Sequence, residues 1–129
     1  MNEDRTKHWI LDEEHHLKKV DLLTWAQWIE QRQNMVVQQD WVGPLFVSTV
    51  FLGLDHNFMG KGPPIVFETM VFVGNGGHDE MCWRYSSWDD AITGHQMALK
   101  KAREWVMNNP LQELLDTSQL DTSRGDEQD

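Results

Sequence analysis

Four side chains in this sequence have the types that acid–base or metal chemistry needs, namely Asp55, His56, Glu68 and His95. A histidine oriented by a carboxylate can act as a general base, and a carboxylate with two histidines can bind a divalent metal ion. Structural roles account for them better than a catalytic or metal site does. Asp55 and His56 can hydrogen-bond a turn, Glu68 can pair with Arg84, and His95 can be a hydrogen-bonded core histidine. We therefore predict no catalytic residue and no metal site, and we keep these four as candidates to be located in the fold.

A second group of residues could bind a small ligand. Arg84 could pair with a phosphate, and the neighbouring Trp83 and Tyr85 could stack on a base. The loop at residues 55–62, which contains Lys61, could complete such a pocket with backbone amides. A nucleotide signal is the ligand class that these residue types would suit.

Two glycine-rich stretches resemble phosphate-binding motifs but do not match them. In "GKG" (60–62) the nearest upstream glycine, Gly53, is too distant, and Gly62 stands where a P-loop has Ser or Thr. The stretch "GNGG" (74–77) lies between two expected strands, whereas a dinucleotide fingerprint lies between a strand and a helix. A hairpin turn explains it better, and we predict no cofactor.

The chain has seven tryptophans, which is many for 129 residues. Three of them, Trp9, Trp28 and Trp41, have no obvious place in the core. A tryptophan on the surface is typical of a contact with a partner, because its large rigid ring suits an interface. We take these three as partner-binding candidates, and a tryptophan-rich core is the equal alternative.

The N-terminal elements must lie at residues 8–35. The runs "HWIL" (8–11) and "LKKV" (17–20) fit either a short extended pair around a turn or one irregular helical turn. Asp21 is a good N-cap, and Leu22, Trp25 and Ile29 follow at helical spacing. The pattern predicts a first helix of about 12 residues.

The strands are expected between residues 35 and 87. "MVVQQDWVGPLFVSTVFLGL" contains two β-rich runs separated by Val42, Gly43 and Pro44, which predicts a hairpin. "IVFETMVFV" (65–73) is apolar on both faces apart from Glu68 and Thr69, as is typical of a central strand covered on both sides by helices or by another subunit. A homodimer or larger assembly is therefore a reasonable suspicion. "GNGGHDE" (74–80) reads as a turn and "MCWRYSS" (81–87) as a fourth strand.

The clearest helix begins after Ser87, which forms a capping box with Asp90, and it ends before Pro110. An apolar stripe follows it and includes His95. Gly94 costs helix stability, so we expect it to permit a close approach of the helix to the sheet. The sequence thus predicts an α+β fold: an antiparallel sheet of about four strands in meander order, an N-terminal helix, and a long C-terminal helix packed on the sheet.

Residues 1–110 are expected to form a single domain, and residues 111–129 an acidic, disordered tail. That tail carries six acids and one Arg, and it accounts for half of the net charge of −10. The charge balance disfavours direct nucleic-acid binding. The apolar runs are too short for a membrane helix, and the first residues lack the pattern of a secretory signal. With one cysteine, Cys82, we expect a soluble protein of a reducing, intracellular compartment.

Four blocks, "WAQWIE", "VSTVFLGLDHNF", "GPPIVFETMVF" and "WRYSSWDDAITGH", together resemble a family of short uncharacterised proteins of phages and prophages. The resemblance covers roughly residues 20–98 and implies an accessory product acting in the bacterial cytoplasm; no catalytic residue carries over. The leading hypothesis is a non-enzymatic protein that binds a host or phage protein, with modulation of host defence or takeover as its role. A nucleotide-signal binder and a metal-dependent hydrolase are the alternatives.

Overall fold

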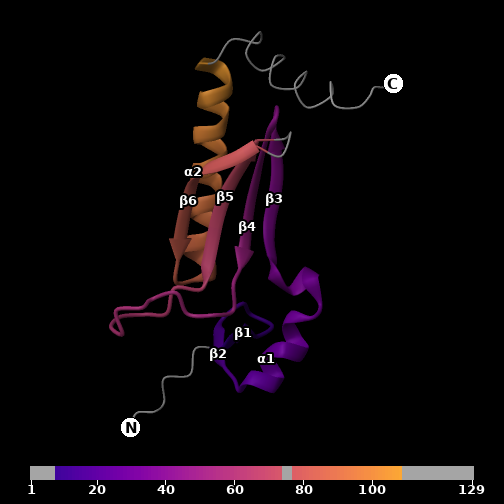
Figure 1. Cartoon of the computed structure of the whole chain (residues 1–129), viewed down its shortest axis with the longest axis vertical. Coiled ribbons are helices and arrows are strands. Elements are labelled where there is room, and N and C mark those ends of the chain that lie inside the picture. Colours follow the sequence, from indigo (N-terminus) through magenta and orange to yellow (C-terminus); the bar gives the residue numbers. More distant parts are fainter. Residues whose placement is uncertain (1–7, 74–76, 109–129) are drawn as a thin grey trace.

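The computed structural model of the chain describes residues 8–73 and 77–108, with only the backbone described at 77–80. The chain is an α+β fold, as the sequence predicted, with a four-stranded antiparallel sheet in meander order β3-β4-β5-β6 and a separate two-stranded sheet (Figure 1). The elements are β1 (Trp9–Leu11), β2 (Leu17–Lys19), α1 (Leu22–Ile29), the 3₁₀ helix η1 (Arg32–Met35), β3 (Val36–Val42), β4 (Leu45–Phe51), β5 (Phe67–Val73), β6 (Gly77–Tyr85) and α2 (Trp88–Asn108).

The predicted hairpin is β3 and β4. Gly43 has a φ of +57°, a conformation that glycine adopts without strain, and Val42 pairs with Leu45 directly across the turn. β4 and β5 then pair in continuous register from residues 45–51 to 67–73, so residues 52–66 connect two neighbouring strands. β6 begins at Gly77, inside the stretch expected to be a turn, and residues 74–76 lie outside the described ones.

α2 covers one face of the main sheet, as predicted (Figure 1). Its first turn is capped by Ser87, whose hydroxyl accepts the backbone N–H of Asp90 at 3.0 Å. Small residues on its inner side bring the helix close to the sheet, and Ala98 and Ala102 pack directly against the strands in a cluster with Val47. A second cluster of buried side chains, Phe51, Val66, Phe67 and Ala91, fills the space toward the start of the helix.

Gly94 lies where α2 packs closely against the Tyr85 side chain of β6. A Cβ atom built there would overlap the ring of Tyr85, so any side chain at this position would have to displace the ring. This confirms the expectation that Gly94 permits close packing of the helix on the sheet.

The other face of the main sheet carries the outward side chains of the same strands. Among the described elements only α2 packs across the sheet, and none lies on this second face, which we call the open face. The expectation that residues 65–73 are covered on both sides is therefore met on one side. The outward residues are Gln39, Trp41, Phe46, Ser48, Val50, Glu68, Met70, Phe72, Cys82 and Arg84.

β1, β2, α1 and η1 form a small N-terminal lobe at one end of the main sheet (Figure 1). The extended pair is the correct alternative for residues 8–20, and α1 starts at the predicted Asp21 cap but has 8 residues instead of about 12. The lobe joins the main sheet through a backbone hydrogen bond from Trp9 to Gly53 of 2.9 Å and through Trp28, whose ring meets Phe51 edge-on at 5.6 Å. No helix of the described residues has the length and hydropathy to cross a membrane. The predicted tail at 111–129 lies outside the described residues.

Candidate functional site

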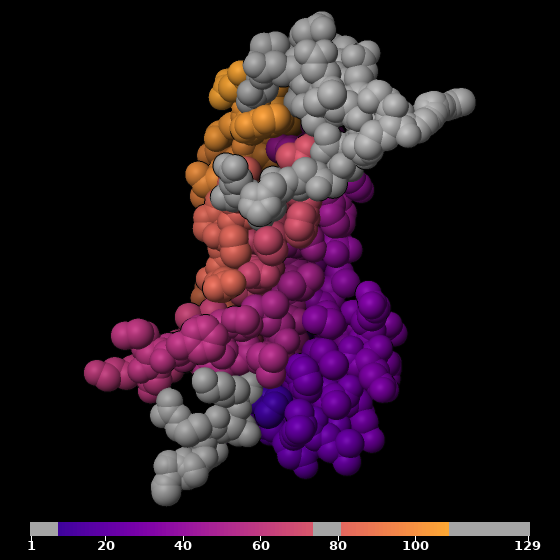
Figure 2. Space-filling view, in the orientation of Figure 1, coloured from indigo at the N-terminus to yellow at the C-terminus, as the bar shows by residue number. Residues whose placement is uncertain are grey.

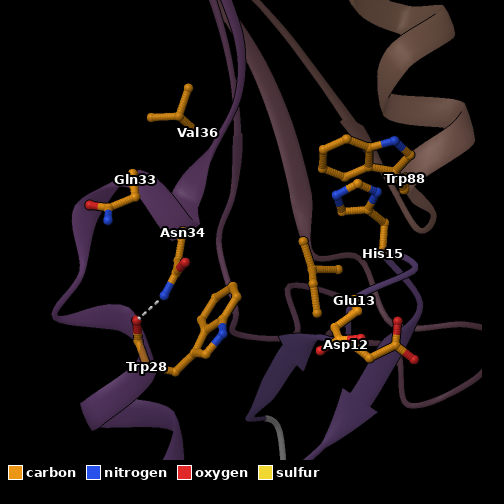
Figure 3. Close-up of a pocket in the computed structure, with 9 residues that line it drawn as sticks. Asp12, Glu13, His15, Trp28, Gln33, Asn34, Val36 and Trp88 are labelled. Carbon is orange, nitrogen blue, oxygen red and sulfur yellow. Dashed lines mark hydrogen bonds between the residues drawn. The ribbon is translucent and has the colours of Figure 1, made fainter.

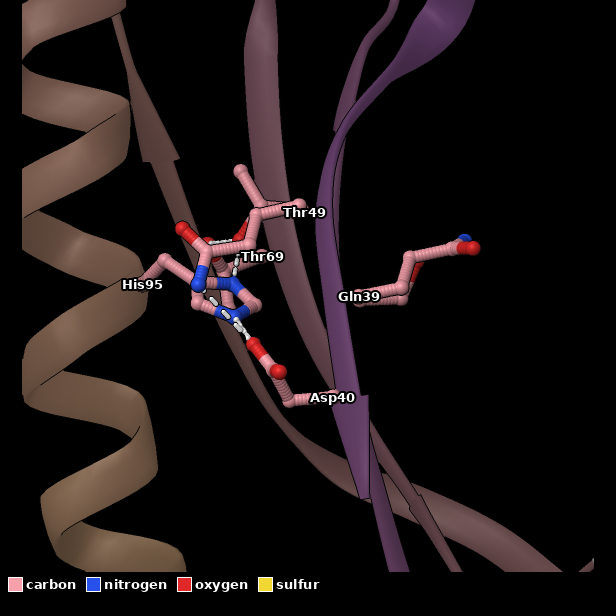
Figure 4. Close-up of polar contacts among 7 residues, drawn as sticks. Gln39, Asp40, Thr49, Thr69 and His95 are labelled. Carbon is pink, nitrogen blue, oxygen red and sulfur yellow. Dashed lines mark hydrogen bonds and ion pairs between the residues drawn. The ribbon is translucent and has the colours of Figure 1, made fainter. Parts of the chain in front are cut away.

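A chain of hydrogen bonds crosses the core between α2 and the sheet (Figure 4). His95 of α2 is 2.8 Å from the carboxylate of Asp40 through Nε2 and 2.7 Å from the hydroxyl of Thr49 through Nδ1. Thr49 continues the chain to Thr69 on the next strand at 2.5 Å. The ring of His95 is completely buried, and the chain reaches solvent at Asp40, whose side chain is 41% exposed.

The charge of Asp40 determines which group donates in its hydrogen bond with His95. Hydrogen bonds from His95 and Gln38 hold the pKa of the Asp40 carboxyl below its usual value, so the carboxylate is ionised at neutral pH and only accepts. His95 Nε2 therefore donates to Asp40, and Nδ1 forms the hydrogen bond with the Thr49 hydroxyl. Every polar atom of the ring is thereby satisfied, which a buried histidine requires.

A nucleophilic triad has the same arrangement, in which a carboxylate, a histidine and a hydroxyl are hydrogen-bonded one after another. Here the hydroxyl of Thr49 belongs to a residue with no exposed surface, and its other contact is Thr69. A substrate carbon has no route to that oxygen. The geometry therefore makes His95 the link that holds α2 to β3, β4 and β5, in keeping with a core histidine.

The remaining catalytic candidates are placed elsewhere than His95. His56 lies in the connection between β4 and β5, where its backbone N–H donates to the Ile65 carbonyl at 2.8 Å and its ring lies 5.8 Å from that of Phe58. Asp55 accepts the backbone N–H groups of Asn57 and Ile65, at 2.7 and 3.0 Å, so it organises its own loop. Glu68 lies on the open face and pairs with Arg84 at 3.0 Å, on the opposite side of the sheet from His95. Among the described side chains, those of residues 8–73 and 81–108, no three His, Cys, Asp or Glu residues are placed to hold a metal ion.

The four ligand-binding candidates are distributed over three places. Arg84 points to the open face, whereas Trp83 and Tyr85 point to the opposite face and pack against the two core clusters. Lys61 is exposed in the connection between β4 and β5. These side chains do not converge on one pocket.

A pocket of about 270 Å³ lies elsewhere, between the β1–β2 turn and η1 (Figure 3). Trp28 forms one wall, and the other is His15 stacked on Trp88 with ring centroids 3.7 Å apart and planes within 5°. His15 has a φ of +67°, unusual for a residue with a side chain, and the turn that imposes it aims the ring at Trp88. The carboxylates of Asp12 and Glu13 line the same pocket and disfavour a phosphate ligand.

The connection between β4 and β5 projects from the body of the molecule (Figures 1 and 2). Its outer part, residues 55–65, is here called the finger. The side chain of Asn57 donates to the carbonyls of Lys61 and Pro63 and accepts the backbone N–H of Met59 at 3.2 Å. Together with the hydrogen bonds to Asp55, these contacts fix the backbone of the finger, whose residues 58–63 are exposed.

The tip of the finger carries two large apolar side chains. Phe58 is 74% exposed and Met59 is 84% exposed. A loop fixed by internal polar contacts would ordinarily present polar side chains to water. Two adjacent apolar residues at its tip therefore make the finger a candidate contact surface.

The three partner-binding tryptophans are placed differently from one another. Trp9 and Trp28 are partly buried against the cluster around Phe51, while Trp41 is 60% exposed on the open face.

Sequence reasoning missed Asp40, Thr49, Thr69, Phe58 and Met59. The two threonines had a readable signal, because alternation in "VSTVF" and "FETMV" places each on the same face as buried apolar neighbours. Asp40 had none, since its partner lies 55 residues away.

No family model, no curated protein and no solved structure matches this chain. The finger, with its fixed backbone and exposed apolar tip, is the candidate functional site that the geometry of the chain itself supports best.

Proposed function

We propose that this chain is a small non-enzymatic protein that binds a host or phage protein through the finger, acting in the bacterial cytoplasm to modulate host defence or takeover. The observation that carries the binding proposal is the pair Phe58 and Met59, exposed at 74% and 84% on a loop that its own hydrogen bonds hold in place. The cellular context rests on the resemblance of the sequence to phage and prophage proteins.

The energetics of binding favour such a loop. Ordering a flexible loop on binding costs affinity, and the contacts of Asp55 and Asn57 remove most of that cost beforehand. Burying a Phe or Met side chain contributes about 1.5–3 kcal/mol, so two adjacent anchors are enough to form a hot spot. The projecting shape calls for a concave, apolar site on the partner.

The alternatives have less support. The pocket beside His15 has carboxylates in its wall, which a nucleotide phosphate would avoid, and the residues chosen for nucleotide binding point in different directions. The hydrolase hypothesis needs Glu68 and His95 in one site, and the sheet separates them.

The test compares three tagged versions of the full chain as bait in bacterial lysates, with and without phage infection. They are the wild type, the double variant F58S/M59S, and the control M107S, which removes a methionine that is 83% exposed at the far end of α2. We expect at least one protein to be retained by the wild type and by M107S and to be lost with F58S/M59S. Retention of the same proteins by all three baits, or by none, contradicts the proposal.

A further inference from the structure

The open face has the composition of a buried surface. In an antiparallel sheet with one face on the core, the outward side chains are normally polar. Here the outward residues of the two central strands include Phe46, Val50, Met70 and Phe72, and Phe72 is 36% exposed. Trp41 on β3 packs beside Phe46, with ring centroids 4.8 Å apart, and stays 60% exposed. Five large apolar side chains thus form one patch across three strands.

The charges on this face identify what can cover it. Two copies of a chain with a net charge of −10 repel each other, so they can meet only at a surface with little net charge. The described charges of the open face are Glu68 and Arg84, which pair with each other at 3.0 Å and cancel. Among the described side chains of this face there is no excess of acidic groups to attract a basic partner, and no net charge to repel a second copy.

The size and shape of the face also suit a second copy. Four strands spaced about 4.8 Å apart, with rises of about 3.3 Å over seven residues, span about 19 by 23 Å. Counted as flat rectangles, two such faces together have an area of roughly 900 Å², and uneven side chains increase the area that is buried. This total is near the ~1,000 Å² that a specific interface has to reach. Two sheets pack well face to face at about 10 Å.

We propose that two copies of this chain associate open face to open face as a two-fold symmetric dimer. In such an arrangement the same residues serve both copies, and Trp41 and Phe72 of each copy contact the apolar patch of the other. No finger residue takes part, so dimerisation and partner binding can fail independently.

The mass of the full chain in solution tests the proposal. Light scattering coupled to size exclusion should give twice the 15.1 kDa of the monomer at micromolar concentration. Trp41→Glu and, separately, Phe72→Glu place a charge in the patch, and each should raise the dissociation constant more than tenfold while circular dichroism stays unchanged. Met107→Glu adds the same charge to an exposed apolar site off the face and should leave the dimer intact. Using two variants keeps the test valid if one of them does not fold.

Cys82 gives a second readout, because the only thiol of the chain lies on the open face. Its rate of modification by a maleimide should fall as the wild-type protein is concentrated through the dissociation constant, and it should not depend on concentration in the monomeric variants. A wild type that is monomeric at 100 µM, a dimer that survives both substitutions, or a thiol protected equally at all concentrations overturns the proposal. The last result would mean that the chain's own remaining residues cover the face.

Discussion

Replacing Gly94 by alanine should destabilise this protein, although the same change in an ordinary helix stabilises it by about 1 kcal/mol. The reason is the Tyr85 ring, whose Cε1, Cζ and Oη atoms occupy the space that the new methyl group would enter. The backbone of α2 is held by its packing across the sheet, and that of β6 is held by its pairing with β5, so the ring has to move.

The magnitude follows from one cost and one gain. Overpacking a core site costs about 1–3 kcal/mol. Subtracting the gain of about 1 kcal/mol in helix propensity leaves a net decrease of up to about 2 kcal/mol in the free energy of unfolding. In a Tyr85→Ala background the ring is absent, and Gly94→Ala should stabilise by about 1 kcal/mol, giving a coupling energy of about 1–3 kcal/mol.

Urea unfolding of the wild type, both single variants and the double variant, followed by circular dichroism, measures this coupling. Thr93→Ala is the matched control, because residue 93 is exposed on the same turn of α2 and gains helix propensity without meeting the sheet. If Gly94→Ala raised the stability of the wild type as Thr93→Ala should, the close approach of α2 to Tyr85 would be refuted.

Three further predictions concern protonation and the finger. Burial raises the pKa of Tyr85 above its ordinary 10.0, so tyrosinate absorbance, which in this chain comes from one tyrosine, should titrate above pH 10 in the folded protein and near 10 in urea. The stabilisation linked to this shift is complete below pH 10 and disappears as the pH rises through the folded-state pKa; Tyr85→Phe should remove the dependence. Hydrogen bonds lower the pKa of Asp40 below 3.8, so its contribution to the free energy of unfolding is present above that pH and is lost as the pH falls through the folded-state pKa. In Asp40→Asn the free energy of unfolding should therefore decrease less steeply as the pH is lowered. Asn57→Ala frees the carbonyls of Lys61 and Pro63, so amide exchange in the finger should accelerate while the thermal midpoint changes little; unchanged exchange would contradict the role given to Asn57.

The parts of the fold that the sequence predicted well are those with local signals. Gly43 and Pro44 end one strand and start the next, and Ser87 caps α2, so the hairpin and the long helix follow from a few adjacent residues. α1 is shorter than predicted because the α-helix ends at Ile29 and the 3₁₀ helix η1 follows at Arg32. The residues after Glu30 are compatible with a continuing helix, so the sequence did not indicate this end. β6 is longer than predicted, since Gly77 looks like a turn residue until it is paired with Val73.

The candidate site was less accessible to sequence reasoning for a physical reason. The exposure of Phe58 and Met59 depends on which backbone groups hydrogen-bond to the side chains of Asp55 and Asn57. The sequence of a glycine-rich connection does not show whether its apolar residues pack inward or face solvent. His95 was correctly read as a core histidine, yet Asp40 and Thr49 become its partners only when distant strands pair.

The N-terminal lobe has a consequence for how the molecule comes apart. No side chain from residue 8 to residue 35 is fully buried, and the buried nitrogen atoms of His8, Trp9 and Trp25 have no hydrogen-bond partner among the described residues. Such a segment gains little from staying attached, so it should detach at a lower cost in free energy than the sheet and α2 require. Under mild denaturation the chain would then pass through a partly open species, in which a protease reaches the N-terminal lobe while the main sheet and α2 keep their native packing.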